Sequence, residues 1–360
     1  MEFLVAGWLC YVSSGSKTDM NGYERIKAAI EGRRADRIPV MLHNFMLAAK
    51  EAGYTMEEFR NDPKKIADAF IQAVERYEYD GILVDIDTVT LAGAVGVPVD
   101  FLQDAPARCT VGHLKSIDGV DNLPPVNIAE YKYVQIWLEA VRRLKDYFGN
   151  EIYIRGNCDQ APFSLASMVQ GVQDWYIDLV LNEEKALQLL EYCSTATCQF
   201  ITLMAETGAD MVSNGDSPAG PQMISPEMYR KFALPYERKI VMTAHSLGLP
   251  YALHICGNTD SILPSMLESG ADALELDHGT DARLAHDLMK DKATFIGNID
   301  PSGILTFGTV DDVKRKTEEI ITIFADTPRF ILNAGCAIPA EAPSENIRAM
   351  IETARQYRIG

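Results

Sequence analysis

The stretch Leu253-His254-Ile255-Cys256-Gly257-Asn258 follows an apolar segment, residues 250–253, that is typical of a buried strand. Because side chains on a strand alternate between its two faces, His254 and Cys256 point the same way. Imidazole nitrogen and thiolate sulfur are ligands that zinc takes at about 2.0 to 2.3 Å. Another thiol follows a second apolar segment far along the chain, in Asn333-Ala334-Gly335-Cys336. A metal site at this stretch requires a fold that brings these two strand ends together.

Eight short apolar segments alternate with helical patterns along the chain. They lie at residues 38–42, 81–84, 152–155, 210–213, 251–253, 273–276, 294–297 and 330–332. This alternation predicts a parallel sheet with helical crossovers, and eight repeats predict a single α/β domain, a (β/α)8 TIM barrel, over residues 21–360. The alternative is a doubly wound open sheet, which would need a glycine-rich phosphate loop after the first strand. Leu42-His43-Asn44-Phe45 stands there instead, so the barrel is favoured.

Two regions fall outside the regular alternation. Residues 1–20 start with an apolar run that lacks a basic leader and is too short to span a bilayer, which takes about 20 residues. We expect an N-terminal extension of low order there, part of which could dock on the barrel. Residues 88–128 contain prolines 98, 106, 124 and 125 and predict an elaborated loop with short strands near 98–101 and 107–111, not a domain boundary.

The composition excludes several classes of protein. Asp and Glu number 51 against 33 Lys and Arg, a formal net charge of −18, and the sequence has no basic stripe, which argues against a nucleic-acid partner. The seven cysteines are odd in number and unevenly spaced, unlike a secreted disulfide framework, so we expect a reducing, cytoplasmic setting. We expect no membrane partner, and the oligomeric state has no visible signal.

Polar side chains follow the predicted strands at the ends where a barrel places its active site. They are His43, Asn44, Asp85, Asp87, Asn157, Asp159, Asp216, His254, Cys256, Asp277, His278, Asn298 and Cys336. Asp85 and Asp87 are the candidates for catalytic general base, although aspartates at strand ends equally often cap the next helix. The expected substrate-binding residues are His43, Asn44, Asn157, Asp216 and His278.

The metal hypothesis has a specific form. Three protein ligands with an exchangeable fourth position distinguish catalytic from structural zinc, and His254, Cys256 and Cys336 would be those three. Glu275, near the neighbouring strand end, is the candidate fourth ligand. The alternative is that both thiols and the imidazole are ordinary buried groups, since free cysteine is among the most buried residue types. The spacing alone leaves both interpretations open.

Several blocks of the chain resemble the uroporphyrinogen decarboxylase superfamily, and within it the zinc-dependent, corrinoid-linked methyltransferases. The blocks are Arg34-Ala35-Asp36-Arg37-Ile38-Pro39-Val40, Gly96-Val97-Pro98-Val99-Asp100-Phe101, Ala161-Pro162-Phe163-Ser164, Ile224-Ser225-Pro226-Glu227-Met228-Tyr229, Pro235-Tyr236, His254-Ile255-Cys256-Gly257-Asn258-Thr259, Gly297-Asn298-Ile299-Asp300-Pro301 and Asn333-Ala334-Gly335-Cys336. The resemblance implies a (β/α)8 barrel from about residue 21 to the C-terminus.

Departures from the decarboxylase pattern indicate the branch. Decarboxylases carry an arginine-rich block after the first strand, whereas residues 42–50 here contain no arginine. A substrate with many carboxylates would lack the bidentate contacts that guanidinium groups supply. The set of His254, Cys256 and Cys336 instead resembles the zinc ligands of the methyltransferases. A decarboxylase and a catalytically silent relative remain alternatives.

The resemblance implies transfer of a methyl group between a small molecule and the cobalt of a corrinoid (cobalamin). The corrinoid is expected on a partner protein, because no cobalamin-module motif of the Asp-x-His-x-x-Gly type occurs. Two chemistries fit, namely methylation of a thiol such as coenzyme M and demethylation of a methyl ether with zinc as Lewis acid. The polar set around His43 and Asn157 favours O-demethylation of a methoxylated, for instance aromatic, substrate. Two thiolate ligands favour the thiol alternative.

Overall fold

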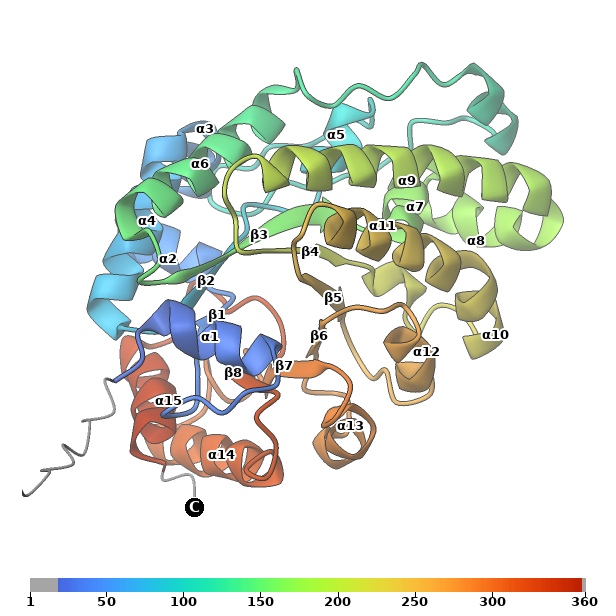
Figure 1. The fold of residues 1–360 in the computed structure, drawn as a ribbon. Coiled ribbons are helices and arrows are strands. Elements are labelled where there is room, and N and C mark those ends of the chain that lie inside the picture. The colour runs from blue at the N-terminus through green and yellow to red at the C-terminus, as the bar shows by residue number, and fades with distance from the viewer. Residues whose placement is uncertain (1–18, 358–360) are drawn as a thin grey trace, which may run out of the picture.

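The computed structural model describes residues 19–357, and within them the eight predicted strands form one parallel sheet in sequential order (Figure 1). The strands are β1 (Met41–Leu42), β2 (Gly81–Val84), β3 (Tyr153–Gln160), β4 (Met211–Gly215), β5 (Tyr251–Ile255), β6 (Ala273–Leu276), β7 (Thr294–Ile299) and β8 (Phe330–Ala334). The first and last strands meet through a parallel bridge between Val40 and Leu332, and the amide of Leu332 donates to the carbonyl of Pro39 at 2.9 Å. The predicted TIM barrel is confirmed.

Helices follow the strands and surround the barrel, as Figure 1 shows. They are α1 (Gly22–Ile30), α2 (Phe45–Glu51), α3 (Met56–Asn61), α4 (Pro63–Tyr77), α5 (Thr90–Ala94), η1 (Ile117–Asn122), α6 (Lys132–Phe148), α7 (Pro162–Gln170), α8 (Val172–Leu181), α9 (Glu183–Ala205), η2 (Ser217–Ala219), α10 (Pro226–Met228), η3 (Tyr229–Ala233), α11 (Leu234–Ser246), α12 (Leu263–Leu267), α13 (Ala282–Met289), α14 (Val310–Ile323) and α15 (Ser344–Gln356). None of the helices within residues 19–357 combines the length and the apolar character needed to cross a membrane.

Gly171 adopts φ +94 and separates α7 from α8. The structure corrects two details of the sequence prediction. The short strands expected near 98–101 and 107–111 are reduced to one antiparallel bridge between Asp100 and Arg108. Three short helices, α2, α3 and α5, were not predicted, because they are too short to show a helical period. The extension predicted for residues 1–20 lies almost entirely outside the described residues.

The barrel interior at the N-terminal ends of the strands, here called the lower end, is an apolar layer. Side chains near the start of several strands, including Met41, Tyr153, Met211 and Ile296, form one buried cluster with α1. Ile26 and Ala29 of α1 belong to this cluster, so α1 closes the N-terminal end of the barrel. Polar residues lie two positions later on several of these strands, directly above this layer.

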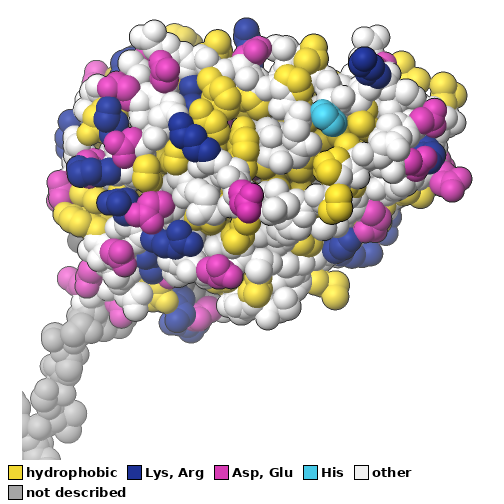
Figure 2. All heavy atoms as spheres, turned by 90° about the horizontal axis from the view of Figure 1, so that it is seen from above, with side chains coloured by type: hydrophobic (Ala, Val, Ile, Leu, Met, Phe, Trp, Pro, Cys, Tyr) yellow, Lys and Arg dark blue, Asp and Glu magenta, His cyan; other side chains and the backbone are white. Residues whose placement is uncertain are grey.

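On the face drawn in Figure 2, apolar side chains gather near the middle, and the Lys and Arg side chains stand among Asp and Glu. A nucleic-acid interface requires basic side chains collected in a stripe. The Lys and Arg side chains drawn on this face are not collected into one stripe.

Candidate metal centre

The two ends of the proposed metal site lie on strands that are not neighbours. His254 is on β5 and Cys256 follows that strand directly, whereas Cys336 lies two residues beyond the end of β8. The strands β6 and β7 separate β5 from β8 in the sheet. Because all strands of a closed parallel barrel run the same way, their C-terminal ends meet at one mouth.

The structure brings the three predicted ligands together. The Nε2 of His254 and the Sγ atoms of Cys256 and Cys336 all lie within 4.8 Å of one another. Nε2 of His254 is 3.0 Å from Sγ of Cys256, and the two sulfur atoms are 3.5 Å apart. Two thiolates that ligate one tetrahedral zinc at ~2.3 Å lie roughly 3.8 Å apart, so the spacing suits such an ion.

Hydrogen bonds orient the ligands. The Nδ1 of His254 lies 3.0 Å from the carbonyl oxygen of Glu275, and since a carbonyl only accepts, Nδ1 carries the proton and Nε2 is free to ligate. This arrangement, with the second ring nitrogen tied to a backbone carbonyl, is usual for metal-ligating histidines. The amide of Cys256 donates to Oγ of Ser217 at 3.2 Å, which fixes the backbone at the strand end.

The charges within the cluster favour thiolate. The hydrogen bond with Cys336 and the neighbouring His254 lower the pKa of Cys256 to about 3 against the opposing effect of burial. The same hydrogen bond and burial raise the pKa of Cys336 well above its usual value. Burial opposes protonation of His254, but the Cys256 thiolate raises its pKa to about 10. In the metal-free cluster Cys256 is therefore the thiolate, while His254 and Cys336 keep their protons, and binding of a divalent cation would release those protons.

A buried polar network lies next to the three ligands. The carboxylate of Glu275 is ion-paired with Arg155, with Oε2 2.5 Å from Nη1, and its Oε1 is 3.4 Å from Nδ1 of His43. Nε2 of His43 is 2.7 Å from Oδ2 of Asp85. Burial opposes a charge on His43, but Asp85 and Glu275 together raise its pKa to about 9. Burial raises the pKa of Glu275, but Arg155 and the two histidines bring it below the usual range.

The two candidate catalytic aspartates have different surroundings. Asp85 contacts His43 and so belongs to the network beside the metal ligands. Oδ1 of Asp87 accepts from the amides of Val89 and Thr90, both at 3.0 Å, so this carboxylate caps the turn that begins α5. Burial raises the pKa of Asp87. These contacts fit the capping alternative for Asp87, and a catalytic role for either aspartate stays an untested prediction.

The expected substrate-binding residues divide into two groups. His43 lies in the network described above, Asn157 is on β3 beside Ser213 of β4, and His278 is half exposed after β6 with Nδ1 2.5 Å from Oδ1 of Asp277. Asn44 and Asp216 are fully buried.

The buried members of that set differ in their partners. Oδ1 of Asp216 accepts from the amide of Ser164 at 2.8 Å and from its hydroxyl at 2.6 Å. The side-chain nitrogen and oxygen of Asn44 are buried without a hydrogen-bond partner among the described residues. The contacts with Ser164 give Asp216 a structural role, and substrate binding by Asp216 or Asn44 stays an untested prediction. The predicted fourth ligand, Glu275, lies outside the three-atom cluster with its carboxylate turned to Arg155.

Sequence reasoning missed two residues of this site, Arg155 and Asn333. Both are polar residues within apolar strands, and both are fully buried. Arg155 lies two positions after Tyr153, and Asn333 lies two positions after Ile331, which are members of the lower interior layer. Side chains alternate along a strand, so a residue two positions after an inward-facing one also points inward. This rule would have predicted that Arg155 and Asn333 both point into the barrel.

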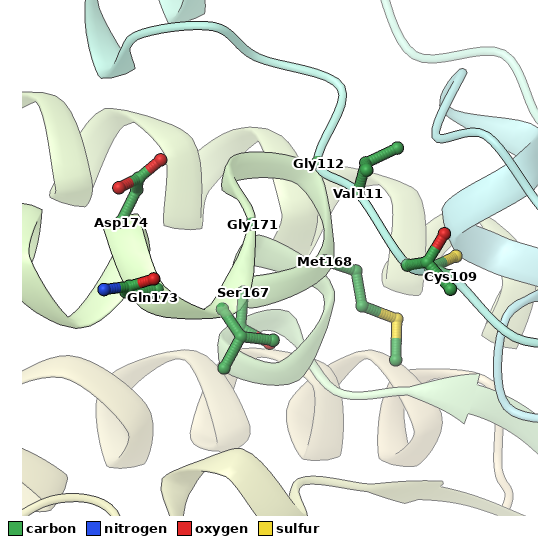
Figure 3. Close-up of a pocket in the computed structure, with 10 residues that line it drawn as sticks. Cys109, Val111, Gly112, Ser167, Met168, Gly171, Gln173 and Asp174 are labelled. Atoms are coloured by element: carbon green, nitrogen blue, oxygen red, sulfur yellow. The ribbon is translucent and has the colours of Figure 1, made fainter.

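A separate cleft of about 280 Å³ lies between the segment that carries Cys109 and Gly112 and the junction of α7 and α8 (Figure 3). Met168, Ser167 and Asp174 line its other side. None of the three metal ligands lines this cleft, so it belongs to the loop region 88–128 and not to the metal centre.

Comparison with known proteins agrees with the fold. Residues 21–357 match the family described as Uroporphyrinogen decarboxylase (URO-D). The chain belongs to the uroporphyrinogen decarboxylase family.

The chain is similar both to methyltransferases and to uroporphyrinogen decarboxylases. The chain is 29% identical over 347 residues to the Methylcobamide:CoM methyltransferase MtbA of Methanosarcina acetivorans, covering 95% of this chain and 99% of the relative. It is 28% identical over 308 residues to the uroporphyrinogen decarboxylase of Thermus thermophilus, covering 83% of this chain and 86% of the relative. A solved structure titled methyltransferase from Methanosarcina mazei superposes with a TM-score of 0.85 at 22% identity, over 93% of this chain and 98% of that chain, which supports the fold.

Proposed function

We propose that this protein is a zinc-dependent methyltransferase that moves a methyl group from the cobalt of a corrinoid to a small thiol. The observation that carries the proposal is the convergence of His254, Cys256 and Cys336 from two distant strands. Identity to the two kinds of relative is nearly equal, 29% and 28%, so identity does not choose between them. The ligand set and the arginine-free segment after β1 favour methyl transfer over decarboxylation.

The residues present fit a zinc ion with three protein ligands. Zinc at this position would lower the pKa of a substrate thiol, so that the thiol reacts as thiolate at neutral pH. His254, Cys256 and Cys336 would hold the ion, the carbonyl of Glu275 orients His254, and the substrate sulfur would bind at the remaining position. Glu275 as fourth ligand stays an untested prediction, and its carboxylate is paired with Arg155.

The thiol acceptor is favoured over the ether that the sequence alone favoured. MtbA of Methanosarcina acetivorans is named for transfer between a methylcobamide and CoM, a thiol, and its similarity covers nearly the full length of both chains. In the reaction, the sulfur forms a bond to the methyl carbon, the carbon–cobalt bond breaks with its electron pair left on cobalt, and the thiol proton is released. We expect the corrinoid to be presented at the barrel mouth by a partner protein.

O-demethylation is the second candidate. The observation that favours it is the set of polar groups near the mouth, His43 with Asp85 and the amide of Asn157, which could hold an oxygenated substrate. In that direction cobalt(I) would take the methyl group from an ether oxygen.

The test uses the full chain loaded with zinc and free methylcobalamin as the methyl donor. Absorbance reports loss of the methyl–cobalt bond when coenzyme M or a panel of other thiols is added. A second arm mixes cobalt(I) cobalamin with a panel of methyl ethers. The proposal expects rapid demethylation of methylcobalamin by a thiol. It is contradicted if thiols have no effect, and methyl–cobalt formation from an ether would favour the second candidate.

A further inference from the structure

The two halves of the metal centre lack a direct connection through the sheet. His254 and Cys256 belong to β5, and Cys336 lies beyond the last residue of β8, Ala334. The ladder between β7 and β8 ends with the amide of Gly335, which donates to the carbonyl of Ile299 at 2.8 Å, so Cys336 is the first residue outside it. The 3.5 Å between the two sulfur atoms must depend on whatever holds the segment 333–338 in place.

Two hydrogen bonds of the His43 backbone hold this segment at both of its ends. The amide of His43 donates to Oδ1 of Asn333 at 3.1 Å, and the amide of Ile338 donates to the carbonyl of His43 at 2.8 Å. Oδ1 of Asn333 also accepts from the amide of Ala334 at 2.8 Å, which bends the chain at the end of β8. Cys336 lies between these two anchor points.

Asn333 also reaches across the barrel interior to β6. Its Nδ2 donates to Oε1 of Glu275 at 3.4 Å. The carbonyl of the same Glu275 accepts from Nδ1 of His254 at 3.0 Å. Asn333, three residues before Cys336 in the chain, is thus connected through Glu275 to His254.

We propose that Asn333 is a positioning residue of the metal centre, which sets the position of Cys336 relative to His254. This inference rests on the zinc site of the proposed function. Asn333 does not touch the metal position itself, and it acts through Cys336 on one side and through Glu275 on the other. Its side chain is fully buried, so every contact it makes is with the protein.

The size of the expected effect follows from the contacts. Partners of metal ligands typically change metal affinity by about 10- to 100-fold when they are removed. Asn333→Ala removes the acceptor of two buried amides as well as the donor to Glu275. Asn333→Asp keeps the acceptor for both amides, removes the donor and places a second carboxylate beside that of Glu275, so it acts on the connection to Glu275.

The experiment measures zinc affinity by competition with a chelator, together with the midpoint of thermal unfolding without metal. Asn346→Ala is the matched control, because Asn346 is equally buried, donates to the carbonyls of Leu305 and Gly308 at 3.0 and 2.9 Å, and lies on α15. We expect zinc affinity to fall roughly 10- to 100-fold in both Asn333 variants. We expect Asn346→Ala to lose thermal stability while keeping the zinc affinity of the unaltered chain.

The outcomes are distinguishable. Unaltered zinc affinity in a folded Asn333→Asp variant overturns the inference and leaves the proposed function standing. If Asn333→Ala does not fold, Asn333→Asp decides alone. An equal loss of affinity in Asn346→Ala also overturns the inference, because the effect would then reflect stability only. Absence of zinc binding by the unaltered chain removes both the proposed function and this inference.

Discussion

The two ends of the barrel interior differ in chemistry although they are built by the same strands. The lower end is apolar, with Met41, Met211 and Ile296 packed against α1. The upper end carries Arg155 and Glu275 as a buried ion pair, beside the three metal ligands. In barrels the N-terminal face contributes stability and the C-terminal face carries the chemistry. Mutations at the two ends should therefore separate stability from metal binding.

The largest expected effect is on the upper end. Cys336→Ala should lose stoichiometric zinc and reduce methyl transfer by more than the ~10- to 100-fold typical of a lost outer partner, because a ligand itself is removed. The barrel should stay folded, since Cys336 lies outside the strands. Metal analysis, circular dichroism and the methylcobalamin assay measure the three quantities.

The matched control for that variant is Cys198→Ala. Cys198 is a partly buried thiol on α9 whose Sγ lies 3.2 Å from Oγ1 of Thr243. Loss of zinc from Cys198→Ala, or full zinc content in Cys336→Ala, would contradict the assignment of ligands.

Breaking the ion pair at the upper end should affect both properties. Arg155→Met leaves the buried carboxylate of Glu275 without its main partner, which typically costs about 3 to 5 kcal/mol. The double variant Arg155→Met with Glu275→Gln should recover much of this loss, because the uncompensated charge is gone. Urea unfolding of the single and double variants measures the difference, and equal stability of the two variants would contradict a paired charge.

A mutation at the lower end should change the stability of the fold and leave zinc affinity nearly unaltered. Met211→Ala removes a fully buried side chain from the apolar layer and should lower the free energy of unfolding by about 2 to 5 kcal/mol. Zinc affinity should stay within about twofold of the unaltered chain. A drop in zinc affinity as large as that of the Asn333 variants would show that the two ends are not separable.

The smallest effect concerns a buried acidic pair outside the barrel interior. Burial and the charge of Asp216 raise the pKa of Glu237 well above its usual value, and burial raises that of Asp216 to about 6. The hydroxyl of Tyr229 donates to the carboxylate of Glu237. Groups with a raised folded-state pKa stabilise fully below their unfolded pKa, about 4 for these acids, and lose that stabilisation as pH rises through the folded value.

Glu237→Gln should therefore flatten the decline in stability between about pH 5 and 8, while Tyr229 keeps an acceptor. Thermal unfolding midpoints across this pH range measure the decline. A variant that loses stability with rising pH as steeply as the unaltered chain would exclude the pair as its source.

The sequence was sufficient to predict the barrel and the cluster of His254, Cys256 and Cys336, for identifiable reasons. Eight apolar runs with helical spacers leave few topologies, and a histidine and a cysteine two apart on a strand share one face. The sequence could not show that Asp87 caps α5, that Asp216 is held by Ser164, or that Glu275 pairs with Arg155. Those roles depend on contacts between strands far apart in the chain, and a carboxylate at a strand end has the same appearance in sequence whether it caps, pairs or ligates.

Metal content combined with extended X-ray absorption at the zinc edge tests the central claim most directly. The unaltered chain should contain one zinc per molecule, with two sulfur neighbours at about 2.3 Å and one imidazole nitrogen at about 2.0 to 2.1 Å. Addition of coenzyme M should raise the count to three sulfur neighbours. Absence of stoichiometric zinc, or a zinc shell with fewer than two sulfurs, would contradict a catalytic site built by His254, Cys256 and Cys336.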